Sequence, residues 1–391
     1  MRLRRMIFID QAVGTILCTM LSLFHWFKRR LFPARPRKVS SIAVLKFFGM
    51  GSIILCTPLL DAIRKKYPDA RIYFITFAIN EPLLRCAEPV DEIVTVRPDN
   101  FLTFARDVIV RLLHLRRRGV DMVFDLEFFA RFSMIFSYLT GAPYRVGYYT
   151  KTFWRGNLLT HPTYFNAYKH ITEVFMALGE SVGAEPVELP LKPRLRIDPV
   201  HRERIRSLLS QSGLDGDKPL IVVNVNASDR CLEGRWPPDR FAGLMDHMVE
   251  ELAIRPVLTG AGEEEEYVQH VLSIMKNPEQ TISLAGKLDF YGLAGLLAEA
   301  HLVITNDTGP LHLSAVMDTP VMAFYGPDTP VRYAPLVDNR KVFFADLYCS
   351  PCLNVYNAKM SECRGINICM KAIELEEVKE ALRQFLANGR F

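Results

Sequence analysis

A polar turn between a predicted strand and a predicted helix offers the clearest chemistry in this chain. Residues 302–305 are apolar enough for a buried strand, residues 309–317 have helical spacing, and the turn between them is Asn306-Asp307-Thr308-Gly309-Pro310. Asp307 or Thr308 can cap the helix, and Pro310 suits its first turn. The free N–H groups of such a helix start attract anions, and Gly309 lets a diphosphate approach the backbone. The alternative is an ordinary capped helix, which is common in α/β proteins.

Four cysteines near the C-terminal end form a second chemical pattern. Their spacing is C-x2-C-x10-C-x5-C, made by Cys349, Cys352, Cys363 and Cys369. Four thiolates opened by a C-x-x-C turn suit tetrahedral zinc, so we expect a structural zinc site that staples the tail. The alternatives are disulfides or redox-labile thiols, and an iron–sulfur cluster. A metal or redox protein built around these cysteines is a third hypothesis of function, weaker than the two given at the end of this section.

The segments that must position these residues repeat the same alternation twice. In the first half, 41–46, 71–77, 90–96 and 120–125 are predicted strands, and 53–67 has helical spacing. After polar, proline-bearing sequence at 185–199 the pattern restarts. The second half has predicted strands at 219–225, 255–259, 281–284, 302–305 and 321–325, and predicted helices at 238–252, 267–275, 290–300 and 309–317. Strands that alternate with helices indicate parallel, doubly wound sheets.

We therefore predict two Rossmann-like α/β domains that face each other across a cleft, with ligands beyond the carboxyl ends of the strands. A length of 391 residues suits two domains better than one. The expected boundaries are a membrane-associating segment at 1–40, a first, acceptor domain at 41–195, a second, donor domain at 196–345, and a Cys-rich tail with a closing helix at 346–391.

Composition narrows the class of protein further. Hydrophobic residues make up 49% and charged residues 23% of the chain, which is globular composition. The net charge of +5 is small for this length, so a nucleic-acid partner is not expected. Four further cysteines show no pairing pattern and no cleavable leader is evident, so we expect a cytoplasmic protein.

The first forty residues are predicted to contact a membrane surface. The run from Gln11 to Trp26 contains no Asp, Glu, Lys or Arg, and basic residues flank both of its ends. It is shorter than the roughly 20 residues that span a bilayer. We favour a helix at the inner face of the cytoplasmic membrane, with Phe24, Trp26 and Phe27 at headgroup depth. The alternatives are a helix packed on the protein's own surface, a spanning helix and a signal peptide.

Beyond these patterns, the sequence resembles glycosyltransferase family 9, the lipopolysaccharide heptosyltransferase family. The strongest motifs are TNDTGPLHL at 305–313 and TPVMAFYGP at 319–327. Weaker ones are KFFGMGSIILCTP at 46–58, RWPPDRF at 235–241, LTG at 258–260 and LAGK at 284–287. Each motif alone is weak, but they follow one another in the family's order over residues 40–345.

The resemblance implies the GT-B fold and an inverting, metal-independent sugar transfer that needs no cofactor, from a nucleotide-diphosphate donor similar to ADP-heptose. It assigns the donor's sugar and diphosphate to Asp307, Thr308, Gly309, Pro310 and His312. After the turn at Thr259 and Gly260, it assigns the ribose hydroxyls to Glu263 or Glu264. The alternative for these glutamates is the start of a solvated helix.

Two positions depart from the family pattern, and the first concerns the catalytic base. The family places Gly-Asp in the first loop, where this chain has Gly51-Ser52. A serine hydroxyl cannot act alone as a base, because inverting transfer needs a carboxylate or histidine near the nucleophile.

A replacement for that base is available after the predicted strand at 120–125. Asp125 and Glu127 stand at its carboxyl end, so we predict Glu127 as the base, with Asp125 second. The alternative is that both carboxylates form structural pairs with Arg131 or Arg145.

The second departure concerns the cation that meets the phosphates. The family often has Lys two residues before the Trp of RWP, where this chain has Gly234. We predict that Arg230 or Arg235 supplies the charge, since a guanidinium matches phosphate geometry. The alternative is an exposed arginine without a role.

The acceptor contacts are predicted in the first half of the chain. Cations beside aromatic residues suit an anionic sugar, so we predict that Arg145 and His170 bind the acceptor. We predict the same role for Gly51, which lies in the first loop. The alternative for His170 is an ordinary histidine at a helix start.

Two interpretations of function lead from these patterns. The first is an inverting glycosyltransferase that moves a heptose-like sugar onto a lipopolysaccharide-type or other lipid-linked glycan acceptor at the membrane. The second is a catalytically silent sugar-nucleotide or glycan-binding module in a membrane-associated assembly, which Ser52 favours.

Overall fold

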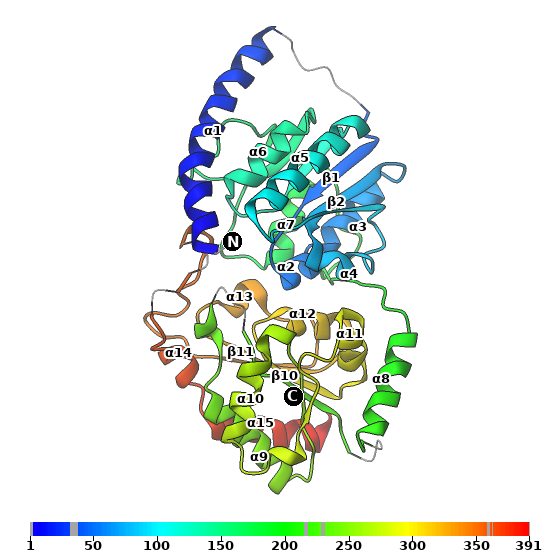
Figure 1. The fold of residues 1–391 in the computed structure, drawn as a ribbon, viewed down its shortest axis with the longest axis vertical. Helices are drawn as coiled ribbons and strands as arrows, with labels where there is room; N and C mark the ends of the chain where they lie inside the picture. The colour runs from blue at the N-terminus through cyan, green and yellow to red at the C-terminus, as the bar shows by residue number, and fades with distance from the viewer. Residues whose placement is uncertain are drawn as a thin grey trace. The chain divides into compact units, whose positions relative to one another are not determined.

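The computed structural model describes residues 3–31, 38–214, 218–227, 231–357, 360–361 and 363–390; within the first helix, the side chains of residues 3–7 and 29 are not described. The chain divides into two compact units, Met1–Leu195 and Arg196–Phe391, and each is a layered α/β body (Figure 1).

The sheet of the N-terminal unit has six parallel strands in the order β3-β2-β1-β4-β5-β6. Its strands are β1 (Ser41–Leu45), β2 (Arg71–Phe77), β3 (Glu92–Val96), β4 (Met122–Asp125), β5 (Tyr144–Tyr149) and β6 (His161–Tyr164). The central strands β1 and β4 are buried along their whole length, which accounts for their nearly continuous apolar sequence. The strand order runs outward from β1 to β3 on one side and from β4 to β6 on the other. The switch point, where such sheets bind ligands, therefore lies between β1 and β4.

Helices cover both faces of this sheet. They are α2 (Met50–Leu55), α3 (Thr57–Lys66), α4 (Glu81–Leu84), α5 (Phe101–Arg118), α6 (Arg131–Leu139) and α7 (Ile171–Glu180), with a 3-10 turn η1 (Ala78–Asn80). The single helix predicted over 53–67 is instead two helices, α2 and α3, which meet at Cys56. Pro58 lacks a backbone N–H and restricts the residue before it, so the hydrogen-bond ladder is interrupted there.

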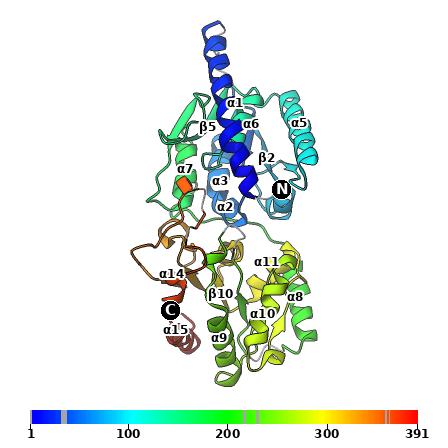
Figure 2. The ribbon, with the colours of Figure 1, turned by 60° about the vertical axis from the view of Figure 1, so that its left-hand side comes forward.

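One more helix belongs to this unit and lies outside its layers. Helix α1 (Leu3–Leu31) packs against α6, as both views of the ribbon show (Figures 1 and 2). Its segment Phe8–Lys28 is long and apolar enough to cross a membrane by length and composition.

The C-terminal unit repeats the same plan. Its six parallel strands lie in the order β12-β11-β10-β7-β8-β9, so its switch point falls between β7 and β10. The strands are β7 (Ile221–Asn224), β8 (Val257–Leu258), β9 (Ile282–Ser283), β10 (Leu302–Asn306), β11 (Val321–Tyr325) and β12 (Arg340–Phe344). The prediction of doubly wound α/β units is therefore confirmed.

The core of this unit is aromatic and is closed by the last helix. The Trp236 ring stacks on Phe324 at 4.5 Å between centroids, and α15 buries Val378, Leu382 and Phe385 in the same cluster. The helices are α8 (Val200–Gln211), α9 (Pro238–Glu250), α10 (Glu265–Ile274), α11 (Phe290–Glu299), α12 (Gly309–Val316), α13 (Pro330–Tyr333), α14 (Ile368–Lys371) and α15 (Leu375–Asn388). Short 3-10 turns are η2 (Leu232–Gly234), η3 (Gly262–Glu264), η4 (Pro278–Gln280) and η5 (Val355–Asn357).

A carboxyl on α3 makes the stability of the N-terminal unit depend on pH. Burial raises the pKa of Asp61 from 3.8 to about 6, with Glu188 and Glu88 adding to the effect and Arg194 opposing it. The protonated form is favoured in the folded state, so this contribution is complete below pH 4 and is lost as the pH rises towards 6. After allowance for the partial exposure of Asp61, Asp61→Asn should stabilise the protein by about 1–2 kcal/mol at pH 7.5.

The measurement is urea unfolding of Asp61→Asn and wild type at pH 4 and pH 7.5. The two proteins should be closest in stability at pH 4. Asp69→Asn, at an exposed position of the following turn, serves as the matched control and should change little at either pH. Equal effects of Asp61→Asn at the two pH values would contradict the assignment.

Candidate functional site

The carboxyl edge of the C-terminal sheet carries a connected set of buried amides. Asn224 at the end of β7 donates from Nδ2 to Thr305 Oγ1 and Thr308 Oγ1, both at 3.2 Å. Asn306 at the end of β10 donates to the carbonyls of Val225 (3.0 Å) and Asn226 (2.9 Å), and its Oδ1 accepts from the N–H of Trp236 (3.0 Å). These bonds fix the loops that follow two neighbouring strands, at the switch point of the sheet.

The start of α12 lies at the same edge. Thr308 occupies the N-cap position with an extended backbone, but no side chain caps the helix there, because the Thr308 hydroxyl bonds to Asn306 O (3.2 Å) and to neighbouring side chains. Thr308 therefore holds the predicted N-cap position, but neither it nor Asp307 supplies the expected side-chain hydrogen bond to the helix. A helix start without a side-chain cap keeps N–H groups for an anion.

Within the described part of the chain, three buried polar atoms at this edge have no hydrogen-bond partner. They are Nδ1 of His312, Nε of Arg235 and Oδ1 of Asn226. His312 is only 4% exposed, and its Nε2 lies 3.7 Å from Asp307 Oδ1. Because buried polar groups are almost always satisfied, unpaired atoms gathered at one edge indicate a place for a polar ligand.

The predicted cation Arg235 follows η2 and is stacked on an aromatic ring. Its guanidinium carbon lies 3.7 Å from the ring centroid of Tyr267, on α10. The stacking orients the guanidinium while leaving its N–H groups to bind a ligand. The other candidate, Arg230, lies outside the described residues.

The LTG turn after β8 approaches the same amides. A side chain on Gly260 would place Cβ 2.8 Å from Asn226 Nδ2, so only glycine fits there. Thr259 is buried, and its carbonyl is 3.5 Å from Asn226 Nδ2. Glu264 accepts from the N–H of Ala261 (2.8 Å), which starts the helical segment, whereas Glu263 is exposed. Glu264 thus has a structural contact at a helix start, as the alternative expected, and the side chain of Glu263 lies in solvent.

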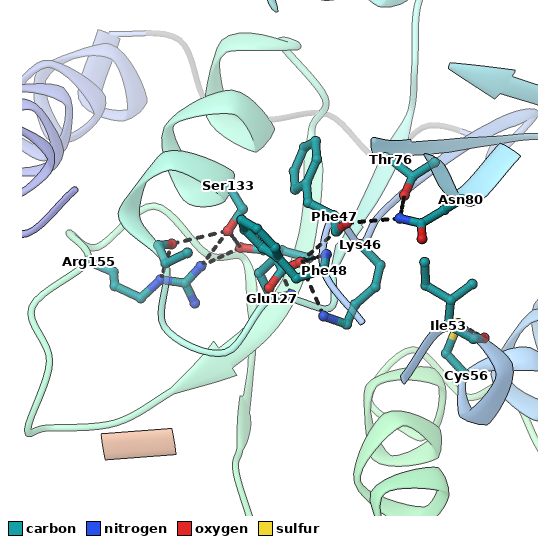
Figure 3. A network of polar contacts seen from close by, with 12 residues as sticks. Lys46, Phe47, Phe48, Ile53, Cys56, Thr76, Asn80, Glu127, Ser133 and Arg155 are labelled. Atoms are coloured by element: carbon teal, nitrogen blue, oxygen red, sulfur yellow. Dashed lines mark hydrogen bonds and ion pairs between the residues drawn. The ribbon is translucent and has the colours of Figure 1, made fainter. Parts of the chain in front are cut away.

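The switch point of the N-terminal sheet holds the predicted base, Glu127. Three donors converge on its Oε1: Lys46 Nζ at 3.2 Å, Phe47 N–H at 2.7 Å and Phe48 N–H at 3.2 Å (Figure 3). Lys46 is 2% exposed and Glu127 is 8% exposed. Glu127 therefore fixes the backbone of the loop after β1. The sequence did not reveal these hydrogen bonds.

That loop leads into α2, where Gly51 and Ser52 lie in the first turn. Asn80 supports it from the other side by donating to the carbonyl of Phe47 at 3.0 Å and to Thr76 Oγ1 at 2.9 Å (Figure 3). Since Leu45 and Asp125 are register partners, the loops that begin at Lys46 and Leu126 leave the sheet side by side. The structure thus brings Ser52 and Glu127 to one edge of one sheet.

Asp125, predicted as the second choice of base, is fully buried and structural. Its Oδ2 accepts from Ser133 Oγ (3.0 Å) and from the Arg155 guanidinium, and its Oδ1 accepts from the N–H of Glu127 (3.1 Å). Burial raises the pKa of this carboxyl, and Arg155 opposes that rise. A catalytic role for Asp125 is corrected, because a side chain with no exposed surface cannot meet a substrate. The partners of the two carboxylates are Arg155 and Lys46 instead of Arg131 and Arg145.

Two of the three acceptor residues predicted on this unit, Arg145 and His170, are engaged in its own structure. Arg145 is 5% exposed, and its guanidinium donates to the carbonyls of Leu158 and Ala142. His170 is the N-cap of α7, where Nδ1 bonds Thr172 Oγ1 at 2.8 Å. Arg145 braces β5 and has almost no surface for a substrate, so its predicted acceptor role is corrected. His170 caps a helix but is only half-buried, so its acceptor role stays a prediction.

The four tail cysteines lie in the described part of the tail and are not joined by disulfides there. All four thiols are free, and among the described residues no group of three or more His, Cys, Asp or Glu side chains is placed to hold a metal ion. Burial raises the pKa of Cys369 to about 11, and the other three cysteines add to the rise, so the thiols are neighbours. The structural zinc site at these cysteines therefore stays a prediction.

Several residues of these sites escaped the sequence analysis. Asn224 ends β7, Asn226 follows it and Lys46 follows β1, and a position at the end of a strand was a usable signal. Arg155 and Tyr267 gave no such signal, because each contributes through a partner far away in the sequence.

Comparison with solved structures shows which known fold this architecture matches. Two parallel α/β units, each with a switch point at the carboxyl edge of its sheet, are the architecture of the GT-B fold. A solved glycosyl transferase family 9 structure from Veillonella parvula has a TM-score of 0.71 at 24% identity and covers 90% of this chain and 99% of its own. The Escherichia coli ADP-heptose lps heptosyltransferase II has a TM-score of 0.68 at 22% identity, covering 88% and 99%.

The family follows from the sequence comparisons. The family model of glycosyltransferase family 9 (heptosyltransferase) matches residues 111–361, and the chain belongs to this family. Lipopolysaccharide heptosyltransferase 2 of Salmonella typhimurium is 26% identical over 308 residues, which are 75% of this chain and 84% of the relative. The predicted family and GT-B fold are confirmed, and the protein is a heptosyltransferase-like glycosyltransferase.

Proposed function

We propose that this enzyme transfers a heptose-like sugar, with inversion and without a catalytic metal, from an ADP-sugar to a lipopolysaccharide-type or other lipid-linked glycan. The observation that carries the donor assignment is the set of unpaired atoms on Arg235, His312 and Asn226 around the uncapped start of α12. The relatives named for ADP-heptose and lipopolysaccharide support the choice of donor and acceptor.

The donor's diphosphate needs positive potential and hydrogen-bond donors. The first turn of α12 supplies N–H groups and the positive end of the helix dipole, and Arg235 supplies a full charge held in place by Tyr267. These groups would stabilise the nucleoside diphosphate as it leaves with the bonding electrons of the anomeric carbon–oxygen bond.

The acceptor needs a group that removes its proton. In the proposed reaction, Glu127 takes the proton of the acceptor hydroxyl while that oxygen bonds to the anomeric carbon. Glu127 Oε1 is engaged by three internal donors, which hold the carboxylate in a fixed orientation. Ser52 and Gly51, on the neighbouring first turn of α2, would orient the acceptor.

A thermal-shift comparison of nucleotides tests the donor. ADP should raise the melting temperature, and UDP and GDP should raise it far less. Arg235→Met should weaken ADP binding by about tenfold to a hundredfold, since a hydrogen bond to a charged group contributes about 1.5–3 kcal/mol. Arg383→Met, whose side chain is 41% exposed on α15, is the matched control and should bind ADP as wild type does. Equal shifts with all three nucleotides would contradict an adenine-specific donor.

A second candidate function is a catalytically silent sugar-nucleotide or glycan-binding module. Ser52 at the family's Asp position and the internal donors on Glu127 favour it. This module would show the ADP shift without any transfer of sugar by the wild-type protein.

A further inference from the structure

We propose that α1 is an anchor that holds the enzyme on the surface of an anionic lipid bilayer without crossing it. The two faces of α1 differ sharply: one packs against α6 and the other is exposed. Binding to lipid is therefore measurable without nucleotide or acceptor, so its failure would leave the proposed reaction untouched.

The inner face of α1 is fitted to the protein. Asp10, Gly14, Cys18, Ser22 and His25 recur at helical spacing and are all withdrawn from solvent to some degree. The Asp10 carboxylate accepts from the first two N–H groups of α6, Arg131 (3.0 Å) and Phe132 (2.7 Å), and so caps that helix from outside.

The middle of this face docks on α6 and on the loop at 154–159. Cys18 has no exposed surface and packs with Met134 and Leu158. Thr19 Oγ1 accepts from Trp154 Nε1 at 2.8 Å, and Ser22 Oγ accepts from the N–H of Asn157 at 2.9 Å. The fit is close, since a side chain on Gly156, which has a φ of +75°, would place Cβ 2.4 Å from Ser22 Oγ.

These contacts oppose a bilayer-spanning position. A spanning helix is surrounded by lipid, so α1 would have to leave α6 and carry the Asp10 carboxylate towards the hydrocarbon. The N–H groups of Arg131 and Phe132 would lose their partner at the same time. The docked helix keeps all of these groups satisfied and only one side available to lipid.

The outer face of α1 is apolar and exposed from Phe8 to Leu31 among the side chains that are described. Ile16, Met20, Leu23, Phe24 and Leu31 are each at least 60% exposed, and Phe8, Ile9, Val13, Leu17, Trp26 and Phe27 are exposed as well. Exposed apolar patches of this extent mark interaction sites. At the C-terminal end, the Arg30 guanidinium lies 5.2 Å from the centroid of the Trp26 ring, a pairing suited to the headgroup region.

Charge selects a lipid surface over a second copy of the chain. The basic residues of α1 lie in its two end turns, Arg4 and Arg5 at one end and Lys28, Arg29 and Arg30 at the other. Its single acid, Asp10, is turned to α6. Two such helices packed together would bring like charges near each other, whereas anionic headgroups complement both ends.

The test is co-sedimentation of the full-length protein with vesicles. Wild type should bind phosphatidylcholine vesicles that contain 30% phosphatidylglycerol (roughly the anionic fraction at which surface potential attracts basic helices), and salt should weaken the binding. Ile16→Asp/Phe24→Asp, at positions 62% and 60% exposed, should bind at least tenfold more weakly with unchanged thermal stability. Val200→Asp/Tyr348→Asp, at positions 54% and 94% exposed on the C-terminal unit, places the same charge elsewhere and should bind as wild type does.

Other results would overturn the proposal. Resistance of the bound protein to alkaline carbonate would indicate a spanning helix. Self-association in the absence of vesicles that the α1 variant abolishes would make a second copy the occupant. Equal binding by wild type and the α1 variant, or binding by neither, would show that this face does not meet lipid.

Discussion

Glu127→Gln is expected to lower kcat by about 10²- to 10⁴-fold, the range contributed by a general base, while ADP binding stays within about twofold of wild type. The glutamine oxygen can still accept from the N–H groups of Phe47 and Phe48, so the loop after β1 keeps its support. What is lost is a carboxylate able to take a proton. Transfer is measured by mass spectrometry of the glycan product, and binding by thermal shift.

A double variant separates catalysis from loop positioning. In Glu127→Gln the buried charge of the Lys46 ammonium, which is 2% exposed, loses the carboxylate that pairs with it at 3.2 Å. Lys46→Met/Glu127→Gln removes that buried charge and should be as inactive as Glu127→Gln. Recovery of transfer in the double variant, or an unchanged pH–rate profile in Glu127→Gln, would assign Glu127 a positioning role only.

Arg155→Met is expected to cost about 3–5 kcal/mol of stability, because it leaves the Asp125 carboxylate buried without its counter-charge. Both side chains of this pair are nearly inaccessible, at 5% and 0% exposure. Burial raises the pKa of Asp125, so its protonated form is favoured in the folded state. The destabilisation should therefore shrink as the pH falls and this carboxyl takes up a proton.

Urea unfolding followed by fluorescence and circular dichroism measures this loss. Arg155→Met/Asp125→Asn removes the stranded charge and should recover much of the stability. Arg202→Met breaks an exposed pair with Glu299, with 46% of the arginine side chain accessible, and should cost less than about 1 kcal/mol. A loss of that small size for Arg155→Met would contradict a supporting role for the buried pair.

The sequence was most informative where local patterns decide structure. Strands β1, β2, β10 and β11 lie where their apolar runs predicted them, because central strands of parallel sheets are buried on both faces. Strands β5 and β6 were missed because Gly147, Pro162 and several polar residues break the apolar pattern towards the edge of the sheet. The polar turn before α12 was recognisable for the same local reason, since a strand end, a polar turn and a helix start are consecutive.

Other features of the sites depend on contacts between distant segments. Arg155 meets Asp125 across thirty positions, and no local spacing distinguishes it from the other arginines near α6. Arg145 and His170 stand among aromatic residues, as a ligand-binding cation would. In the structure, Arg145 donates to two backbone carbonyls and His170 caps α7. A cation near aromatic residues is as useful to the protein's interior as to a substrate.

The docking of α1 also has a practical consequence for anyone who trims the chain. A shortened protein that begins near Lys38 would lose the Asp10 cap on α6 and uncover Met134 and Leu158, which are now sealed by Cys18. Below that cap, Ser133 on α6 bonds Asp125, which in turn holds the N–H of Glu127. Removing α1 would thus replace one exposed apolar surface by another. It would also weaken the hydrogen bonds that hold Glu127, the proposed proton acceptor, in place.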